Sequence, residues 1–231
     1  MFKIVTLKNG LRLALEEMDN TRAISFGIWT RNGSRDESLE TSGISHFIEH
    51  MLFKGTIRRS SKQIADDIDA VSGHLNAYTT KDYTCYHVRT LDIHFDQALD
   101  VLSDMFLNSK FDDEELSKER GVILEEIDMY EDSPDELSHD LLQRGMFGDH
   151  SLGLPILGTK QSISKFGHET LKNYFVNNYA PSRIVLSMTG RFKTDEAVAK
   201  LEKIFGGLKD PENPAKLAPP PAIHPCVITR S

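Results

Sequence analysis

The sequence predicts an α+β fold in which a mainly antiparallel β-sheet packs against helices. Apolar residues alternate on both sides of Asn9-Gly10, a pattern typical of a β-hairpin. Residues 74–90 alternate in the same way and are rich in Tyr and Thr, which favour strands. From about 95 to 147, in contrast, apolar residues recur at helical spacing. Strands paired by hairpins, with helices grouped between them, indicate one sheet covered by helices.

Most of the predicted strands lie in the first 90 residues. The Asn9-Gly10 pair predicts a type I′ turn, and the apolar side chains of this hairpin are Ile4, Leu7, Leu11, Leu13 and Leu15. Further strands are expected at Ala23 to Thr30, as a pair within 74–90 that turns near Lys81-Asp82, and at Arg183 to Thr189.

The predicted helices are concentrated in the second half. They cover residues 60–73, a segment around 98–106, and residues 112–130, 136–147, parts of 160–179 and 195–205. Gly73 is placed to end the first of them. Asp112 and Glu115 resemble a capping box at the start of the helix over 112–130.

Composition excludes several classes of partner. The chain has 27 Lys and Arg against 35 Asp and Glu, a formal charge of -8, whereas binding to a phosphate backbone requires the opposite sign. We therefore expect no nucleic acid partner. No apolar run approaches the ~18 residues of a membrane span, and the N-terminus lacks the pattern of a signal peptide. Cys85 and Cys226 form no paired motif. A soluble, cytoplasmic protein without a membrane partner is the expectation.

Proline placement predicts where the domain ends. Six of the nine prolines fall in the last 21 residues, which indicates an extended linker. We expect one domain over 1–210, a Pro-rich linker over 211–225 and the start of a following domain at 226–231.

The segment His46-Phe47-Ile48-Glu49-His50 is the sharpest local motif, and its flanking apolar residues have helical spacing. At about 100° per residue, His46, Glu49 and His50 share one helix face. Two imidazoles one turn apart can bind a single zinc ion, and a neighbouring carboxylate can act as a general base. The simpler alternative is a polar helix face that happens to hold two histidines.

A third ligand is expected from the helix over 112–130. Its apolar stripe consists of Leu116, Val122, Ile123, Ile127 and Tyr130. Glu119 and Glu126 fall inside this stripe, about 20° apart on the helical wheel, and two carboxylates on a buried face require a partner. A zinc site would supply one, with Glu126 as ligand and Glu119 as its supporting carboxylate. The alternative is that Glu119 pairs with a basic residue such as Arg120 or Arg89.

These residues together resemble a known family. The run from His46 to Thr56, preceded by Gly33-Ser34-Arg35 and Gly43, is similar to the motif of the pitrilysin and insulinase family of zinc metallopeptidases. The resemblance is strongest to bacterial relatives of the beta subunit of the mitochondrial processing peptidase, and it extends from the first hairpin to Asn178-Tyr179-Ala180-Pro181.

The resemblance implies a function and a set of residues. It implies that His46, His50 and Glu126 bind one Zn²⁺, that Glu49 is the general base and that Glu119 supports the site. It further implies that the strand around Asn76 and Ala77 is an edge on which a peptide substrate is laid.

The expected activity is that of a zinc endopeptidase acting on peptides or unfolded segments in the bacterial cytoplasm. The resemblance implies the N-terminal catalytic half of a clamshell of two halves. The second half would be the rest of the same protein or a partner subunit in a dimer. The charge of -8 favours basic peptides. The alternative from another class is a non-catalytic scaffold or assembly subunit, which the complete ligand set disfavours.

Overall fold

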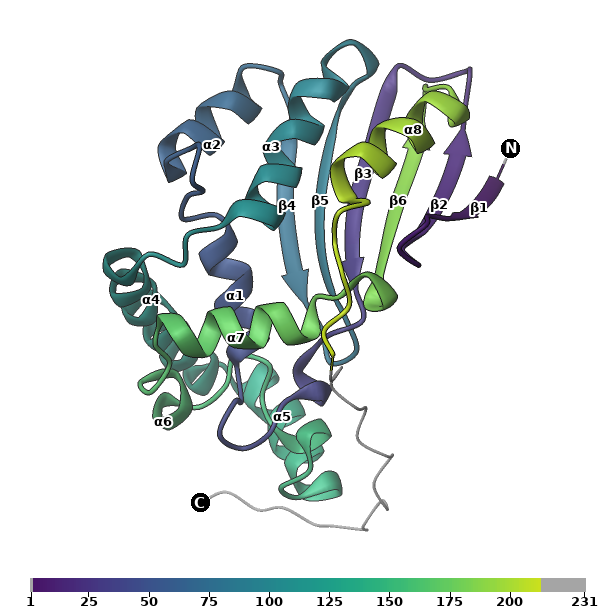
Figure 1. Cartoon of the computed structure of the whole chain (residues 1–231). Coiled ribbons are helices and arrows are strands. Elements are labelled where there is room, and N and C mark those ends of the chain that lie inside the picture. Colours follow the sequence, from purple (N-terminus) through teal and green to yellow (C-terminus); the bar gives the residue numbers. More distant parts are fainter. Residues whose placement is uncertain (1, 213–231) are drawn as a thin grey trace.

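A six-stranded mixed sheet lies at the centre of the computed structural model, which describes residues 2–212 (Figure 1). Its order is β1-β2-β6-β3-β5-β4, and every neighbouring pair is antiparallel except β2 and β6. The strands are β1 (Phe2–Thr6), β2 (Arg12–Glu17), β3 (Ala23–Thr30), β4 (His74–Thr79), β5 (Thr84–Leu91) and β6 (Ile184–Gly190). The predicted fold class, a mainly antiparallel sheet with helices, is confirmed.

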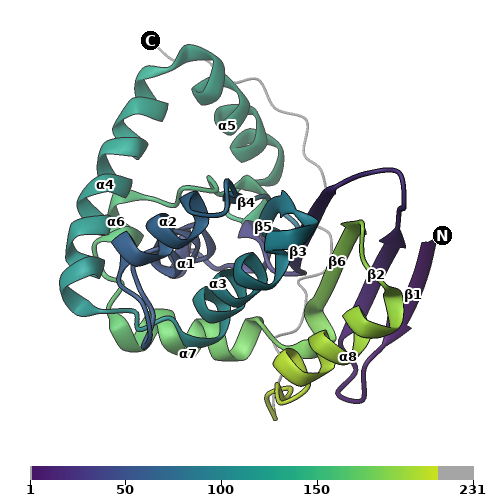
Figure 2. The ribbon, with the colours of Figure 1, turned by 90° about the horizontal axis from the view of Figure 1, so that it is seen from above.

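The helices cover one side of the sheet and continue around its β4 edge (Figure 2). They are α1 (Ile44–Leu52), α2 (Ser61–Asp69), α3 (Phe95–Asn108), α4 (Asp113–Asp132), α5 (Pro134–Phe147), α6 (Lys160–Ile163), α7 (His168–Asn178) and α8 (Thr194–Phe205). Short 3-10 turns are η1 (Ser34–Asp36), η2 (Asp92–His94), η3 (Ser151–Gly153) and η4 (Pro181–Arg183). Figure 2 shows α2, α3 and α8 on the same side of the sheet, with α4 and α5 far from β1.

Alternation along the strands places the core between the sheet and these helices. In β3, Ile24, Phe26 and Ile28 are buried, while Ser25 between them is exposed on the opposite face. Phe26 contacts Phe95 of α3 with ring centroids 6.2 Å apart, so the central strand packs directly on the helical layer.

Two local predictions were wrong in detail. The first hairpin closes through Gly10 at φ +88° while Asn9 keeps a negative φ, so its turn is not type I′; instead Gly10 N–H bonds to the Leu7 carbonyl at 3.0 Å. The helix predicted to end at Gly73 ends at Asp69, and Ser72 takes the left-handed conformation at φ +47°. The strand predicted at Arg183 to Thr189 is confirmed as β6, which inserts between β2 and β3, a position that hairpin patterns do not address.

The domain boundaries remain a prediction. Of the expected linker at 211–225, all but the first two residues lie outside the described residues, as does the expected segment 226–231. The chain still packs shortly before that point, because Asn9 Nδ2 donates to the carbonyls of Phe205 and Leu208 at 3.0 and 3.2 Å. No helix within residues 2–212 has the length and apolar character needed to cross a membrane.

Candidate metal centre

Helix α1 is the most deeply buried helix at the site. Seven of its nine residues are buried, and its apolar side packs into the core through Phe47 and Ile48, both with no exposed area. The predicted helix over the His46-to-His50 motif is thus confirmed. Burial of one face fixes how the helix is rotated, so the opposite face holds both histidines toward α4.

Helix α4 supplies the opposing side chains. Its N-terminus is capped by Asp112, whose Oδ1 accepts from the N–H groups of Glu114 and Glu115 at 3.0 and 3.2 Å. The buried stripe consists of Leu116, Glu119, Ile123 and Ile127. It is narrower than predicted, because Val122 is 48% exposed and Tyr130 is 39% exposed.

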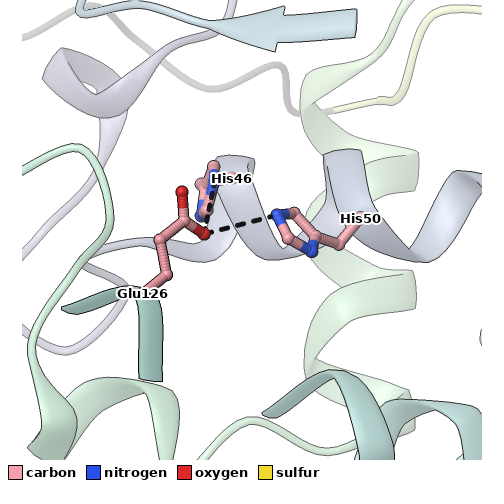
Figure 3. A group of neighbouring side chains, drawn as sticks. All are labelled: His46, His50 and Glu126. Carbon is pink, nitrogen blue, oxygen red and sulfur yellow. Dashed lines mark ion pairs between the residues drawn. The ribbon is translucent and has the colours of Figure 1, made fainter. Parts of the chain in front are cut away.

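His46, His50 and Glu126 converge (Figure 3). Nε2 of each histidine lies 3.7 Å from the same Oε2 of Glu126, and one ligand atom of each residue lies within 4.8 Å of the others. The imidazole centroids of His46 and His50 are 4.6 Å apart. Two nitrogens and one carboxylate oxygen form the donor set that catalytic zinc takes from proteins, leaving a fourth position open. The three residues predicted as ligands therefore lie where they could hold one zinc ion.

Glu119 orients one of these donors. Its Oε2 lies 3.0 Å from His50 Nδ1, and its Oε1 accepts from Lys54 Nζ at 2.6 Å. A carboxylate on Nδ1 favours the tautomer that leaves the Nε2 lone pair free for a metal. The alternative pairing with Arg120 does not occur, since that side chain donates to the carbonyls of Ile163 and Phe166. A basic partner exists, but it is Lys54, one turn beyond His50.

His46 is held differently from His50. It is only 8% exposed, and its Nδ1 is buried with no hydrogen-bond partner among the described residues. Burial, together with the neighbouring His50, lowers its pKa to about 3. The imidazole is therefore neutral at physiological pH, the form that binds a metal through a nitrogen lone pair.

Glu49, the predicted base, has one oxygen already engaged. Thr79 Oγ1 at the end of β4 donates to Glu49 Oε2 at 2.6 Å. Burial raises the pKa of Glu49, and the Thr79 hydrogen bond acts in the opposite direction. A general base that works near neutral pH benefits from such a raised value.

Asn76 and Ala77 lie on β4, which is one edge of the sheet. Because Thr80 N–H bonds to the Tyr83 carbonyl, the alternation of an antiparallel ladder points the N–H and C=O of Ala77 away from β5. The Ala77 N–H is taken by Asn76 Oδ1 at 2.9 Å. The backbone of Ala77 therefore faces the free edge, and the Asn76 side chain covers its donor.

Two contacts of the site were not predicted. Lys54 could have been found from its i+4 spacing to His50. Thr79 has no such local sign, because its contact with Glu49 joins residues 30 positions apart.

Comparison with known proteins decides the family. Residues 12–160 match the sequence profile described as insulinase, peptidase family M16, and residues 165–230 match a profile described as the peptidase M16 inactive domain. The chain belongs to the insulinase (M16) peptidase family.

Members of this family resemble the chain over most of its length. The zinc protease YmxG of Bacillus subtilis is 46% identical over 221 residues, which cover 92% of this chain and 54% of YmxG. A probable beta subunit of the mitochondrial processing peptidase from Arabidopsis thaliana is 41% identical over 216 residues, covering 93% of this chain and 41% of that protein. The chain spans about half the length of the curated relatives it matches.

Solved M16 structures share the fold. A putative M16-like peptidase from Alicyclobacillus acidocaldarius superposes with a TM-score of 0.82 at 28% identity, covering 96% of this chain and 52% of that one. A protease from Helicobacter pylori gives a TM-score of 0.87 at 24% identity, with 96% and 54% covered. The described part of the chain therefore has the insulinase-family fold.

Proposed function

We propose that this domain is the zinc-bearing, catalytic part of an endopeptidase that hydrolyses peptides or unfolded polypeptide segments. The observation that supports it best is the convergence of His46, His50 and Glu126 within 4.8 Å, beside a half-buried Glu49. Relatives named as zinc proteases support the same activity. A non-catalytic scaffold would not need two imidazoles and a carboxylate with donor atoms that converge on one point.

Glu49 acts as the general base in this proposal. Zinc, when bound by His46, His50 and Glu126, supplies Lewis-acid chemistry that makes water nucleophilic near neutral pH. Thr79 fixes Oε2 of Glu49, so Oε1 is the oxygen available to take the proton from water and later deliver it to the leaving amine. Glu119 keeps His50 in the ligating tautomer, and Lys54 compensates the charge of Glu119.

The β4 edge is the proposed substrate site. A peptide added as a further strand would bond to the outward backbone groups of Leu75, Ala77 and Thr79. Asn76 must then release the Ala77 N–H, so its amide is freed to bond to the peptide. Main-chain recognition of this kind accepts many sequences, which suits a peptidase with a broad range of substrates.

A second half is part of the proposal. Glu126 is 31% exposed, and Met129 on the same helix is 68% exposed, so α4 lacks a cover over its outer side within residues 2–212. The greater length of the relatives suggests that the remaining half, on the same protein or on a partner subunit in a dimer, closes over this side. The net charge of -8 favours basic peptides, so we expect their cleavage to weaken as salt is added.

Replacement of Glu49 by Gln tests the proposal. Zinc content is measured on purified wild type, Glu49→Gln and the control Glu40→Gln, which changes an exposed carboxylate nine residues earlier. Hydrolysis of a quenched fluorescent peptide is followed for each chain, alone and with the C-terminal half of YmxG supplied in trans. We expect one zinc per chain in all three and a loss of roughly 10²- to 10⁴-fold in rate for Glu49→Gln only.

Two outcomes would contradict it. Wild-type protein that binds no zinc, even after zinc is added, would contradict the proposed metal site. A zinc-loaded Glu49→Gln chain that cleaves peptide at the wild-type rate would show that Glu49 is not the general base.

A further inference from the structure

Glu37 is a buried carboxylate that the proposed chemistry does not use. It follows η1, is 6% exposed, and bonds through both oxygens to the first turn of α1. Its Oε2 accepts from Gly43 N–H at 2.7 Å, and its Oε1 accepts from Ser45 N–H at 2.9 Å. Burying a carboxyl group is costly, so these two bonds indicate a specific role.

The role follows from the N-cap residue of α1, which has no side chain that could accept a hydrogen bond. The N-terminal N–H groups of a helix lack partners within the helix, and the N-cap side chain normally accepts from one of them. Here the N-cap is Gly43 at φ +88°, which has no side chain to offer. A side chain cannot be placed there, because a Cβ on Gly43 would lie 2.5 Å from the Leu157 carbonyl oxygen. Glu37 provides the cap from six residues upstream.

Ser45 is held a second time through its side chain. Asn32 Nδ2 donates to Ser45 Oγ at 3.0 Å, and Asn32 Oδ1 accepts from Tyr174 OH at 3.2 Å. Both the backbone and the hydroxyl of Ser45 are thus fixed by buried groups. His46 is the next residue, so its backbone position is determined by the same bonds.

We propose that Glu37 is a positioning residue for the metal centre, holding the first turn of α1 so that His46 faces His50 and Glu126. The inference rests on the proposed zinc function for its consequence, but its geometric part concerns the metal-free chain. His46 needs this external support because, unlike His50, its Nδ1 has no carboxylate partner within residues 2–212.

Glu37→Gln is the variant that tests this role. Ionised Glu37 offers two acceptor oxygens, whereas glutamine keeps the shape but offers one, so one of the two N–H groups faces an amide nitrogen. Glu37→Asp keeps both acceptors on a shorter side chain and serves as the conservative variant. The matched control is Glu17→Gln, because Glu17 Oε2 accepts from Thr194 N–H at 3.0 Å and so caps α8, away from the metal centre.

Two measurements are made on each chain. The zinc dissociation constant is obtained by competition with a chromophoric chelator, and amide hydrogen exchange is followed in the metal-free chain by NMR. We expect Glu37→Gln to bind zinc about 10-fold more weakly, as for loss of other groups that orient metal ligands, and to exchange faster at Gly43 and Ser45. Glu17→Gln should bind zinc like wild type, and Glu37→Asp should lie between wild type and Glu37→Gln.

The outcomes separate this inference from the proposed function. Wild-type zinc affinity in Glu37→Gln, with stability lowered as in Glu17→Gln, would make Glu37 a structural cap only and overturn the inference. Unchanged exchange at Gly43 and Ser45 would overturn it as well. If wild type itself binds no zinc, the proposed function is wrong, and so is the part of the inference that gives Glu37 a role in zinc binding. The exchange result then decides whether Glu37 holds the turn.

Discussion

The two helices that form the metal centre differ in how firmly the rest of the chain holds them. Helix α1 has seven buried residues out of nine, whereas α4 has four out of twenty. The first turn of α1 is bonded to Glu37, and its far end is followed by Lys54, which is paired with Glu119. The outer side of α4 carries exposed charges and apolar residues such as Met129.

This difference indicates that the two helices contribute to the metal centre in different ways. The two imidazoles sit on a rigid element whose position is set by the core, so they are oriented before any metal arrives. The third donor, Glu126, sits on a helix that only a narrow stripe attaches to the core. We infer that zinc and the remaining half complete the placement of α4, and the predictions below compare the two helices.

The largest expected difference concerns stability. Phe47 of α1 has no exposed area and packs against Phe166 with centroids 6.1 Å apart. Phe47→Ala should lower the free energy of unfolding by about 3–5 kcal/mol. Val122→Ala on α4, where the side chain is 48% exposed, should change it by less than about 0.5 kcal/mol. Urea unfolding followed by circular dichroism measures both, and equal losses would show that the two helices are held alike.

Zinc affinity should depend on one face of α4. Glu126→Gln removes one of the three proposed ligands and should weaken zinc binding by at least about 100-fold, more than loss of a supporting group. Glu125→Gln is the matched control, because one residue along a helix points about 100° away. Competition with a chelator gives both constants, and a Glu126→Gln value within twofold of the control would remove Glu126 from the ligand set.

Glu37, which bonds to the start of α1, should make the free energy of unfolding depend on pH. Burial raises the pKa of Glu37 to about 8, while an unfolded glutamate titrates near 4.3. The folded chain therefore binds more protons between these values, so this group's stabilising contribution is present at low pH and is lost as pH rises through about 8. The slope is at most about 1.4 kcal/mol per pH unit. Urea unfolding from pH 5 to 9 should show the stability of wild type relative to Glu37→Gln falling with pH; a constant difference would contradict the raised pKa.

The smallest effect is expected on the exposed side of α4. Lys118 forms surface ion pairs with Glu114 and Glu115 at 2.9 and 2.8 Å. Pairs of this kind gain little because water screens them and the side chains lose freedom. Lys118→Gln should leave the midpoint of urea unfolding at the wild-type value, at low and at high salt. A clear loss at low salt would show that α4 depends on its surface charges.

Local patterns in the sequence predicted much of the fold and the metal donors. Helical spacing placed His46, Glu49 and His50 on one face of a helix, and the wheel selected Glu119 and Glu126 from many acids. Both inferences depend only on residues within a few turns of each other. The prediction of the strands was wrong only in the geometry of one turn. It did not address the position of β6, whose neighbours β2 and β3 are more than 150 residues away.

Contacts between distant residues were beyond such patterns. Thr79 approaches Glu49 only because the end of β4 lies against α1, and the hydroxyl of a strand threonine has many ordinary roles. The exposure of Val122 was missed for a related reason: the wheel shows which residues share a stripe, but the width of that stripe depends on how closely the neighbouring helix approaches. Which acids bind a metal, and the location of the protein in the cell, stay predictions.

The contact between Gly43 and Gly158 has a consequence for how the chain folds. Neither glycine could carry a side chain, because its Cβ would collide with the backbone beside the other glycine. A Cβ on Gly158 would lie 2.4 Å from the Ser42 carbonyl oxygen. The start of α1 therefore packs against a segment 115 positions later in the chain, and contacts of such long sequence separation form slowly. The helix with the two histidines is local in sequence, yet its final geometry should appear among the last events of folding. A pulse-labelling experiment would find protection in the central strands before it appears at Gly43.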